Sequence, residues 1–383
     1  MSANTDKVNL LIVISNLGHG GAERQVVELC NRLDRDKFNI HLCTLSDHIP
    51  LASSLQSDVT LHTIIKRRKL DISVIWRLIT LIRREDIRVV HSFLLDAEIA
   101  TRIAGRLVKD TIVIGSERNS KHTYSRSMSL ALSATSRLSH AIVANSNAGK
   151  AYHQATFGLD ETKYHVVYNG VDTTRFYPGA SNLTREEFDL PATGFIIGMV
   201  GSFKPQKNHA YLLETIELMT QSRKDFCVLL VGATVQEGDA ASESYHADIM
   251  ADIKRRNLEP YIRLTGARLD IDHVYRLCDA TVLPSLFEGT PNVALESLAC
   301  GVPVIATNVS DNAKVIPDGK VGMIVELDQP KAFSERVLDL IANPALREDM
   351  SKQAAAWIID EFSTDKMAGN MTQVYDTYLT QKA

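Results

Sequence analysis

The stretch ATVLPSLFEGTPNVALESLACGVPVIAT, residues 280–307, decides the fold. Its apolar start, Ala280–Leu283, predicts a buried strand, and residues 302–306 predict a second one. A Gly/Pro/Asn loop at 288–292 separates the first strand from a helix that should begin near Pro291, because proline suits the first helical position. Strand, loop, helix and strand in this order indicate a parallel α/β sheet.

Two carboxylates flank the start of the predicted helix. Glu288 lies in the loop after the first strand, and Glu296 follows in the early helical turns. Ligands of open α/β sheets bind beyond the carboxyl ends of the strands, and a helix N-terminus attracts anions. An anion on the N–H groups of 290–293 would leave both carboxylates to accept hydrogen bonds from hydroxyls. This predicts a phosphate flanked by two polyols, as in a nucleotide sugar, although two Glu residues near a helix start also suit the helix dipole alone.

The E-x7-E spacing, with EGTPNVALESLACGVPVIAT around it, resembles the signature of the retaining glycosyltransferases of the GT-B fold, family 4. The resemblance extends over essentially the whole chain. It implies that Glu288 contacts the donor sugar, that Glu296 contacts the nucleotide ribose, and that the backbone between them meets the diphosphate. The residues of that backbone segment are Gly289, Thr290, Pro291, Asn292 and Val293.

Length and composition predict a two-domain globular protein of the cytoplasm. The chain has 383 residues, of which 45% are hydrophobic and 23% charged, and this length exceeds what one core usually serves. Its five Cys form no C-x-x-C pair, so neither a zinc site nor a disulfide framework is expected. The start MSANTDKVNLL does not resemble a signal peptide, and we find no run of eighteen apolar residues.

Strand-like and helical segments alternate along both halves, which is typical of doubly wound sheets. With the resemblance, this predicts two Rossmann-like parallel-sheet domains that face a central cleft. We expect an N-terminal acceptor-binding domain at 1–177 and a C-terminal nucleotide-sugar domain at 178–363. In the resemblance the last helix, 364–383, packs back onto the first domain.

A Gly-rich turn follows the first predicted strand, in NLGHGGAERQVVELCNRL, and Gly20 and Gly21 would let the backbone approach a diphosphate. A nicotinamide-binding fingerprint is the rival interpretation. Glu23 stands where its third Gly should be, although Asp47 does follow the second predicted strand. The GGAE sequence resembles the family's first loop, where glycine backbone faces the donor phosphates.

The acceptor side is expected on the first domain. His91 ends one predicted strand and is a candidate contact, although a structural hydrogen-bonding role is the simpler interpretation. Another strand ends in GSERNS, where many family members have a His. Glu117 could accept a hydrogen bond from an acceptor hydroxyl, Arg118 could pair with an acceptor phosphate, and Asn119 lies beside them. A structural Glu117/Arg118 ion pair is the equal alternative.

The second half contains GSFKPQK, which resembles the family's donor-phosphate loop. Lys207 matches the expected Lys, Ser202 stands where an Arg is usual, and Lys204 could supply the missing charge. Arg268 is a weaker candidate for a base contact. The run from Asp270 to Asp272 resembles a metal-binding D-x-D, but it precedes a helix where Asp is a favoured cap, so no metal site is predicted.

Charge is distributed unevenly along the chain. Residues 1–175 carry a net +6 and residues 176–383 a net −10. Lys66–Lys69 and an acid-free stretch at 118–159, with an expected helix at 124–138, predict a surface for anionic lipid. A solvated basic face is the alternative, and no nucleic-acid-binding pattern is present in the sequence.

Taken together, these features predict a metal-independent, cofactor-free retaining glycosyltransferase. It would move a hexose or N-acetylhexosamine from a UDP-sugar to a glycan or lipid-linked hydroxyl, in polysaccharide or lipopolysaccharide-type biosynthesis. Lys207, Glu288 and Glu117 are the candidate catalytic residues. We expect it in the cytoplasm, with peripheral contact at the inner face of the membrane. A nucleotide-sugar epimerase, a nicotinamide dehydrogenase and a non-catalytic sugar-nucleotide-binding module are the alternatives.

Overall fold

The computed structural model describes residues 7–68, 71–120, 125–233 and 240–382, which divide into two compact units. Unit 1 comprises the chain up to Gly170 together with the segment from Thr364 onward, and unit 2 is Val171–Ser363. The boundary after Gly170 lies a few residues before the expected one at 177. The chain therefore crosses between the units twice.

Unit 1 contains a seven-stranded parallel sheet in the order β3-β2-β1-β4-β5-β6-β7. Its strands are β1 (Val8–Ile14), β2 (Phe38–Thr44), β3 (Thr60–Thr63), β4 (Val89–Phe93), β5 (Ile112–Glu117), β6 (Ala141–Ala144) and β7 (Tyr164–Val166). The order runs outward in both directions from β1 and β4, so the predicted doubly wound topology is confirmed. The short edge strand β7 was not predicted, because three residues carry little periodic signal.

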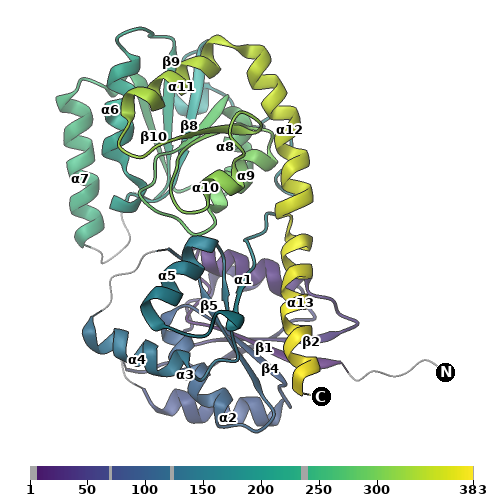
Figure 1. Ribbon diagram of the computed structural model, residues 1–383. Coiled ribbons are helices and arrows are strands. Elements are labelled where there is room, and N and C mark those ends of the chain that lie inside the picture. Colours follow the sequence, from purple (N-terminus) through teal and green to yellow (C-terminus); the bar gives the residue numbers. More distant parts are fainter. Residues whose placement is uncertain (1–6, 69–70, 121–124, 234–239, 383) are drawn as a thin grey trace. The chain divides into compact units, whose positions relative to one another are not determined.

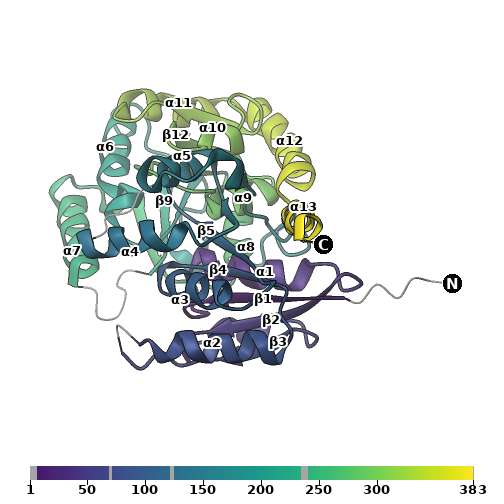
Figure 2. The ribbon, with the colours of Figure 1, turned by 60° about the horizontal axis from the view of Figure 1, so that its bottom comes forward.

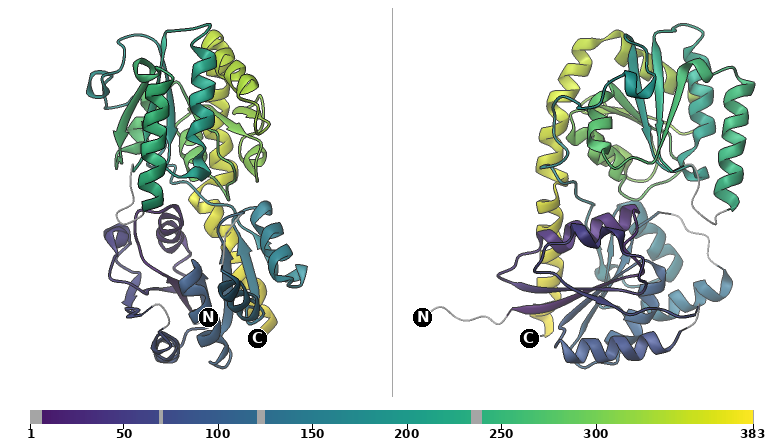
Figure 3. Two further views of the ribbon diagram at one scale, coloured as in Figure 1. Left: turned by 90° about the vertical axis from the view of Figure 1, so that its left-hand side faces the viewer. Right: turned by 180° about the vertical axis from the view of Figure 1, so that it is seen from behind.

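The helices of unit 1 cover both faces of this sheet. They are α1 (Gly21–Arg32), α2 (Ser73–Arg84), α3 (Leu95–Arg106), α4 (Arg126–Ser136), α5 (Asn147–Phe157) and α13 (Thr364–Lys382). Because strand side chains alternate between faces, Leu10 and Ile12 pack with α1 and α13, whereas Leu11 and Val13 pack with α2 and α3. Figure 3 shows α1 and α13 beside the strands of unit 1.

The terminal helix α13 is part of the core of unit 1. Met367, Met371 and Tyr375 are buried in the same cluster as the residues of α1 and β1. Two ion pairs add to this packing, between Arg32 and Asp365 at 3.6 Å and between Lys37 and Asp376 at 2.6 Å. Unit 1 is thus completed by the last residues of the chain.

Unit 2 contains a six-stranded parallel sheet in the order β10-β9-β8-β11-β12-β13 (Figure 1). Its strands are β8 (Phe195–Val200), β9 (Phe226–Val231), β10 (Ile262–Gly266), β11 (Ala280–Leu283), β12 (Val304–Thr307) and β13 (Gly322–Val325). The helices are α6 (His209–Met219), α7 (Ala240–Arg255), α8 (Ile271–Leu277), α9 (Asn292–Ala299), α10 (Asn312–Val315), α11 (Pro330–Ala342) and α12 (Pro344–Phe362). One large cluster of buried side chains joins β8 and β9 to α6 and α11.

The basic stretch of unit 1 forms a shorter helix than the sequence predicted. α4 begins at Arg126 rather than near 124, with the Ser125 hydroxyl accepting from the Met128 N–H at 3.3 Å. Leu132 is buried and Leu130 is exposed. Lys69, and residues 121–124 of the acid-free stretch, lie outside the described residues. Among the helices that the structure describes, none combines the length and apolarity needed to cross a bilayer.

Candidate active site

The strand order of unit 2 reverses between β8 and β11, which are hydrogen-bonded neighbours. At such a switch point the loops leaving the two strands diverge to opposite faces and leave room for a ligand at their carboxyl ends. The loop after β8 contains Lys204 and Lys207, and the loop after β11 contains Glu288. Three of the predicted donor residues, Lys204, Lys207 and Glu288, are therefore brought to one edge of the sheet.

Lys207 and Glu288 form an ion pair at this edge. The Lys207 ammonium lies 2.7 Å from Oε1 of Glu288, and the two side chains are only 17% and 8% exposed. Ser285 donates its hydroxyl to the same Oε1 at 2.7 Å, while Oε2 has a long contact of 3.4 Å with the Gln206 amide. At this degree of burial each charge needs the other, because an unpaired buried charge would strongly destabilise the fold.

Backbone contacts hold the loops around the pair. Gln206, in the short helical turn η4 (Pro205–Lys207), accepts from the Leu286 N–H at 2.9 Å and donates its amide to the Phe287 carbonyl at 2.8 Å. The Glu288 N–H donates to the Ser310 hydroxyl at 3.0 Å, which brings in the loop after β12. Three loops thus fix the position of one carboxylate.

The second carboxylate, Glu296, lies in the second turn of α9. This helix starts at Asn292 with Pro291 as its N-cap, one residue later than predicted. Glu296 is buried, and Tyr275 donates its hydroxyl to Oε2 at 2.9 Å. Gly289, Thr290 and Pro291 are buried too, whereas Asn292 and Val293 at the helix start are partly exposed.

The loop after β8 packs tightly on itself. A Cβ added to Gly201 would lie 3.3 Å from Cε of Lys207, so the lysine stem lies against glycine backbone next to Ser202. Lys204 is partly exposed, and its ammonium forms no hydrogen bond or ion pair within the described residues. The loop therefore combines one paired ammonium with one that is available to a ligand.

Arg268 is held by its own neighbours. Its guanidinium pairs with Asp270 and lies 5.1 Å from the ring centroid of Phe188, and this pairing raises the pKa of Arg268 and lowers that of Asp270. It lines a hollow of about 400 Å³ along the edge strand β10. Asp272 pairs with Arg175 and Arg276, so the two Asp residues of the D-x-D run serve separate arginines.

The Gly-rich turn of unit 1 forms the start of α1. Gly20 is its N-cap, and both Gly20 and Gly21 are exposed. A Cβ added to Gly20 would lie 2.2 Å from a carboxylate oxygen of Glu23, so a larger residue at this position would have to displace that side chain. Glu23 also stands in the first turn, where a carboxylate is stabilised by the positive end of the helix dipole.

His91 is buried in unit 1, in the arrangement expected for the structural hydrogen-bonding role rather than for an acceptor contact. Its side chain is 0% exposed, with Nδ1 2.8 Å from the Tyr375 hydroxyl and Nε2 2.8 Å from the Ser116 hydroxyl. Burial, and secondly the charge of Arg118, lowers the pKa of His91 to about 3. The His91 imidazole is therefore neutral, and both of its ring nitrogens form hydrogen bonds inside the fold.

Glu117, Arg118 and Asn119 follow one another at the carboxyl end of β5. Glu117 is buried and accepts from the Asn119 N–H at 3.0 Å. Arg118 donates to the Asn169 side chain and lies 5.5 Å from the Phe93 ring centroid, and its buried Nε has no hydrogen-bond partner within the described residues. Burial, opposed by Glu117, lowers the pKa of Arg118 to about 10. Within the described residues no Glu117–Arg118 ion pair is seen.

Several residues of these sites were not predicted from the sequence. Gln206, Ser285 and Ser310 hold Glu288, and Tyr275 holds Glu296. Ser285 stands three residues before Glu288, which is a local signal that could have been noticed. The others come from distant parts of the chain, and their pairing has no sequence signature.

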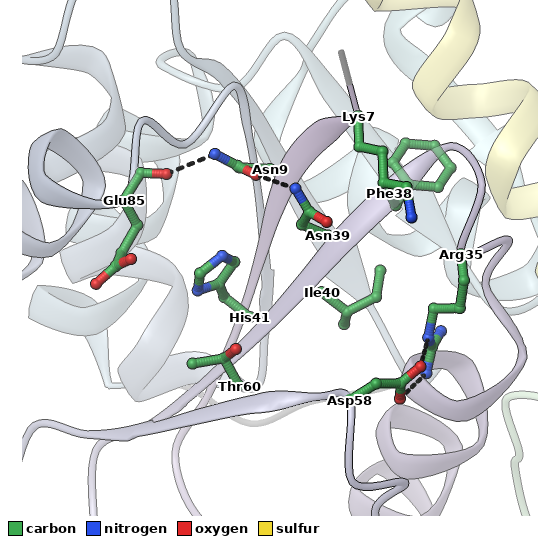
Figure 4. Close-up of a pocket in the computed structure, with 10 residues that line it drawn as sticks. All are labelled: Lys7, Asn9, Arg35, Phe38, Asn39, Ile40, His41, Asp58, Thr60 and Glu85. Atoms are coloured by element: carbon green, nitrogen blue, oxygen red, sulfur yellow. Dashed lines mark hydrogen bonds and ion pairs between the residues drawn. The ribbon is translucent and has the colours of Figure 1, made fainter. Parts of the chain in front are cut away.

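A different hollow, of about 370 Å³, lies where β1, β2 and β3 begin (Figure 4). Asn9 donates there to the Glu85 carbonyl at 2.8 Å, and Arg35 pairs with Asp58 at 2.7 Å. Because ligands of open α/β sheets bind at the carboxyl ends of the strands, this amino-end hollow is not part of the candidate active site.

Comparison with known families decides the assignment. The model of the family described as Glycosyltransferase Family 4 matches residues 19–175, and that of Glycosyl transferases group 1 matches residues 181–357. The chain belongs to the family 4 glycosyltransferases. With its two parallel-sheet units, this glycosyltransferase has the GT-B fold.

Relatives and solved structures agree with this membership. An Escherichia coli protein, UDP-Gal:alpha-D-GlcNAc-diphosphoundecaprenol alpha-1,3-galactosyltransferase, is 26% identical over 92% of this chain and 87% of its own. A glycosyltransferase from Rickettsia africae has a TM-score of 0.84 at 20% identity, covering 98% of this chain and 99% of that one. HepE of Anabaena, solved with UDP, has a TM-score of 0.84 at 16% identity, covering 97% and 100%. At these identities the structures support the fold alone.

The Lys207–Glu288 pair should be visible as an energetic coupling in the glycosyltransferase. Lys207→Met and Glu288→Gln should each reduce the free energy of unfolding of unit 2 by about 1–3 kcal/mol, because each leaves a buried partner unpaired. The double variant should lose less free energy of unfolding than the sum of the losses in the two single variants. Denaturant unfolding of all four proteins measures the coupling, and strict additivity would contradict the pair.

Acid should destabilise both units of the glycosyltransferase through buried histidines. His209 stacks on Phe203 at 4.3 Å, and burial, followed by the charges of Lys207 and His246, lowers its pKa to about 4. Since the unfolded chain takes up a proton near the ordinary pKa of 6.5 and the folded one does not, stability is present above that pKa and is lost as the pH falls.

His91 and His209 should each lower the free energy of unfolding at about pH 5 by about 2 kcal/mol relative to its value at about pH 8. Calorimetry over this range should show both units melting earlier in acid. His91→Gln should reduce the acid shift of unit 1 and leave that of unit 2 unchanged, and His209→Gln should do the reverse. Equal acid shifts in the wild type and both variants would contradict the assignment.

Proposed function

We propose that this glycosyltransferase moves a hexose or N-acetylhexosamine, with retention at the anomeric carbon, from a UDP-sugar to a hydroxyl of a glycan or lipid-linked acceptor. The observation that carries the proposal is the Lys207–Glu288 pair at the switch point of unit 2. It places one cation and one hydrogen-bond acceptor side by side, as a sugar joined to a phosphate requires.

The reaction that fits these groups needs neither metal nor a covalent enzyme intermediate. The acceptor oxygen bonds to the anomeric carbon while the bond from that carbon to the phosphate oxygen breaks, and its electron pair stays with the diphosphate. The acceptor proton passes to the departing phosphate oxygen on the same face, which retains the configuration. Negative charge develops on the diphosphate, so fixed positive groups there lower the barrier.

The protein has several such groups for the diphosphate. A lysine ammonium has three N–H donors, and Glu288 takes one from Lys207, which leaves two for phosphate oxygens. Lys204 adds a second cation, and the N-terminus of α9, from Gly289 to Val293, adds backbone N–H groups and its dipole. We assign Ser202 to the same ligand. The exposed Gly20–Gly21 turn of unit 1 remains, by itself, a candidate contact of a diphosphate.

The carboxylates fit the two polyols on either side of the diphosphate. Oε1 of Glu288 is occupied by Lys207 and Ser285, so its less engaged Oε2 is the oxygen we assign to a sugar hydroxyl. Glu296 is assigned to the nucleotide ribose. Arg268 remains the candidate for the base, although its pairing with Asp270 would have to accommodate the ligand.

The activities for which similar proteins are named support a UDP-sugar and a diphosphate-linked acceptor. The Escherichia coli relative is named for UDP-Gal and GlcNAc-diphosphoundecaprenol, and HepE was solved with UDP and with UDP-glucose. On the acceptor side we assign Arg118 to the acceptor phosphate, and Glu117 and Asn119 to its hydroxyls. A lipid-linked acceptor implies peripheral contact with the inner face of the membrane.

Variants of the two carboxylates test the donor assignment. Glu288→Gln should lower kcat by about 100-fold or more, because the Lys207 ammonium and the sugar hydroxyl lose their charged partner. Glu296→Gln keeps the Tyr275 hydrogen bond and should mainly raise the KM for donor, by about tenfold. Steady-state kinetics, with calorimetry of UDP binding, separates the two effects. If both variants match the wild type, the site is elsewhere, and donor turnover without any acceptor would indicate an epimerase.

Arg118 can be tested with a matched pair of acceptors. Arg118→Gln should raise the KM for a sugar diphosphate acceptor by about 10–100-fold, since charge-assisted hydrogen bonds contribute about 1.5–3 kcal/mol. The KM for a phosphate-free glycoside of the same sugar should be unchanged. A similar loss with both acceptors would contradict a phosphate-specific role.

A further inference from the structure

We propose that Ser242 and Tyr245 of α7 are positioning residues of the donor site, because their hydroxyls fix both ends of the loop after β8. The donor loop is defined as residues 201–209, and it contains Lys204 and Lys207. The inference rests on the proposed function of this loop in holding the donor diphosphate. The fixation itself can be measured without any substrate.

The inner face of α7 changes its character along the helix. Ile249 and Ile253 pack into the core of unit 2, as the apolar face of a helix normally does. One and two turns closer to the N-terminus, the same face carries Tyr245 and Ser242. Ser242 is buried and Tyr245 is partly buried. Because polar groups inside a protein are hydrogen-bonded, the partners of these two hydroxyls indicate what the face holds.

The Tyr245 hydroxyl holds the last residue of the donor loop. It accepts from the backbone N–H of His209 at 3.1 Å and lies 3.5 Å from Nδ1 of the same residue. His209 is also the first residue of α6, whose N-cap Asn208 forms no side-chain capping hydrogen bond. The first N–H groups of a helix have no acceptor inside the helix. An acceptor from α7 therefore fixes the point at which the loop becomes α6.

The other end of the donor loop is held through Phe203. Ser242 donates its hydroxyl to the Phe203 carbonyl at 3.2 Å. The Phe203 ring is buried, stacks on the His209 ring with centroids 4.3 Å apart, and meets the His246 ring edge-on at 4.8 Å. α6 and α7 lie side by side at this point (Figure 2). One face of α7 thus contacts both ends of the donor loop.

The position of Lys207 depends on these two ends. Lys207 lies between them, and its ammonium must reach Oε1 of Glu288 at 2.7 Å. Charge interactions weaken with distance, so a loosened loop would weaken the contact of this ammonium with a diphosphate. Negative charge on the diphosphate grows as its bond to the sugar breaks. The transition state should therefore lose more from a loosened loop than the bound donor does.

Steady-state kinetics of Tyr245→Phe test this role, since the variant loses one hydroxyl and keeps the ring. It should lower kcat about tenfold and change the donor KM by less than about twofold. Tyr261→Phe is the matched control, because the Tyr261 hydroxyl forms no hydrogen bond among the described residues of unit 2, and it should keep the wild-type kcat. A wild-type kcat for Tyr245→Phe would overturn the proposal.

A double-mutant cycle with Lys207→Met separates positioning of the ammonium from a general loss of stability. In the Lys207→Met background, Tyr245→Phe should lower kcat by less than about twofold, because the group that it positions is gone. The same tenfold loss in both backgrounds would overturn the proposal. A wild-type kcat for Lys207→Met would overturn the proposed donor site together with this inference. A strong loss in Lys207→Met beside an unaffected Tyr245→Phe would overturn this inference alone.

Hydrogen–deuterium exchange measures the fixation in the free protein. In Tyr245→Phe the amides of residues 203–209 should exchange about tenfold faster, since the His209 N–H loses its acceptor. Ser242→Ala should also accelerate exchange in this segment. The amides of β11, on the neighbouring strand, should exchange as in the wild type. Unchanged exchange of residues 203–209 in both variants would overturn the proposal, whatever their kcat.

Discussion

A buried ammonium and a buried carboxylate, 2.7 Å apart, are the interaction on which the proposed donor site of this glycosyltransferase depends. Neither charge could remain in that environment alone, because the loss of hydration would exceed what the loops can offset. Each therefore fixes the other, and both become fixed points for a ligand. The polar contacts of Gln206, Ser285 and Ser310 serve the same end by holding the backbone of three loops around one carboxylate.

The topology explains why this pair forms where it does. Lys207 and Glu288 are 81 residues apart, yet they leave neighbouring parallel strands at the point where the strand order reverses. Parallel strands end at a common edge, so residues from distant loops meet there without any special sequence relation. A charged pair in this position is preorganised before substrate arrives, which is the condition under which electrostatic stabilisation is most effective.

Much of the fold could be predicted because apolar strands such as Phe195–Val200 and Ala280–Leu283 carry a strong local signal. The candidate positions of Lys207 and Glu288 followed from local motifs as well. The sequence could not reveal which side chains far apart in the chain form hydrogen bonds with each other. His91 was a reasonable acceptor candidate at a strand end, but Tyr375, 284 positions away, closes over it and turns it into an interior hydrogen-bonding group. The hydrogen bond from the Tyr275 hydroxyl to Glu296 likewise could not be predicted from the sequence.

The helix α13 contributes side chains to the core of unit 1. In the sequence, however, the whole of unit 2 separates α13 from the rest of unit 1. A ribosome makes Met367, Met371 and Tyr375 only after the whole of unit 2. Unit 2 is therefore the first unit to have all of its residues outside the ribosome, and the earlier-made unit 1 has to wait with the apolar side of α1 uncovered. The order of maturation is thus the reverse of the order of translation.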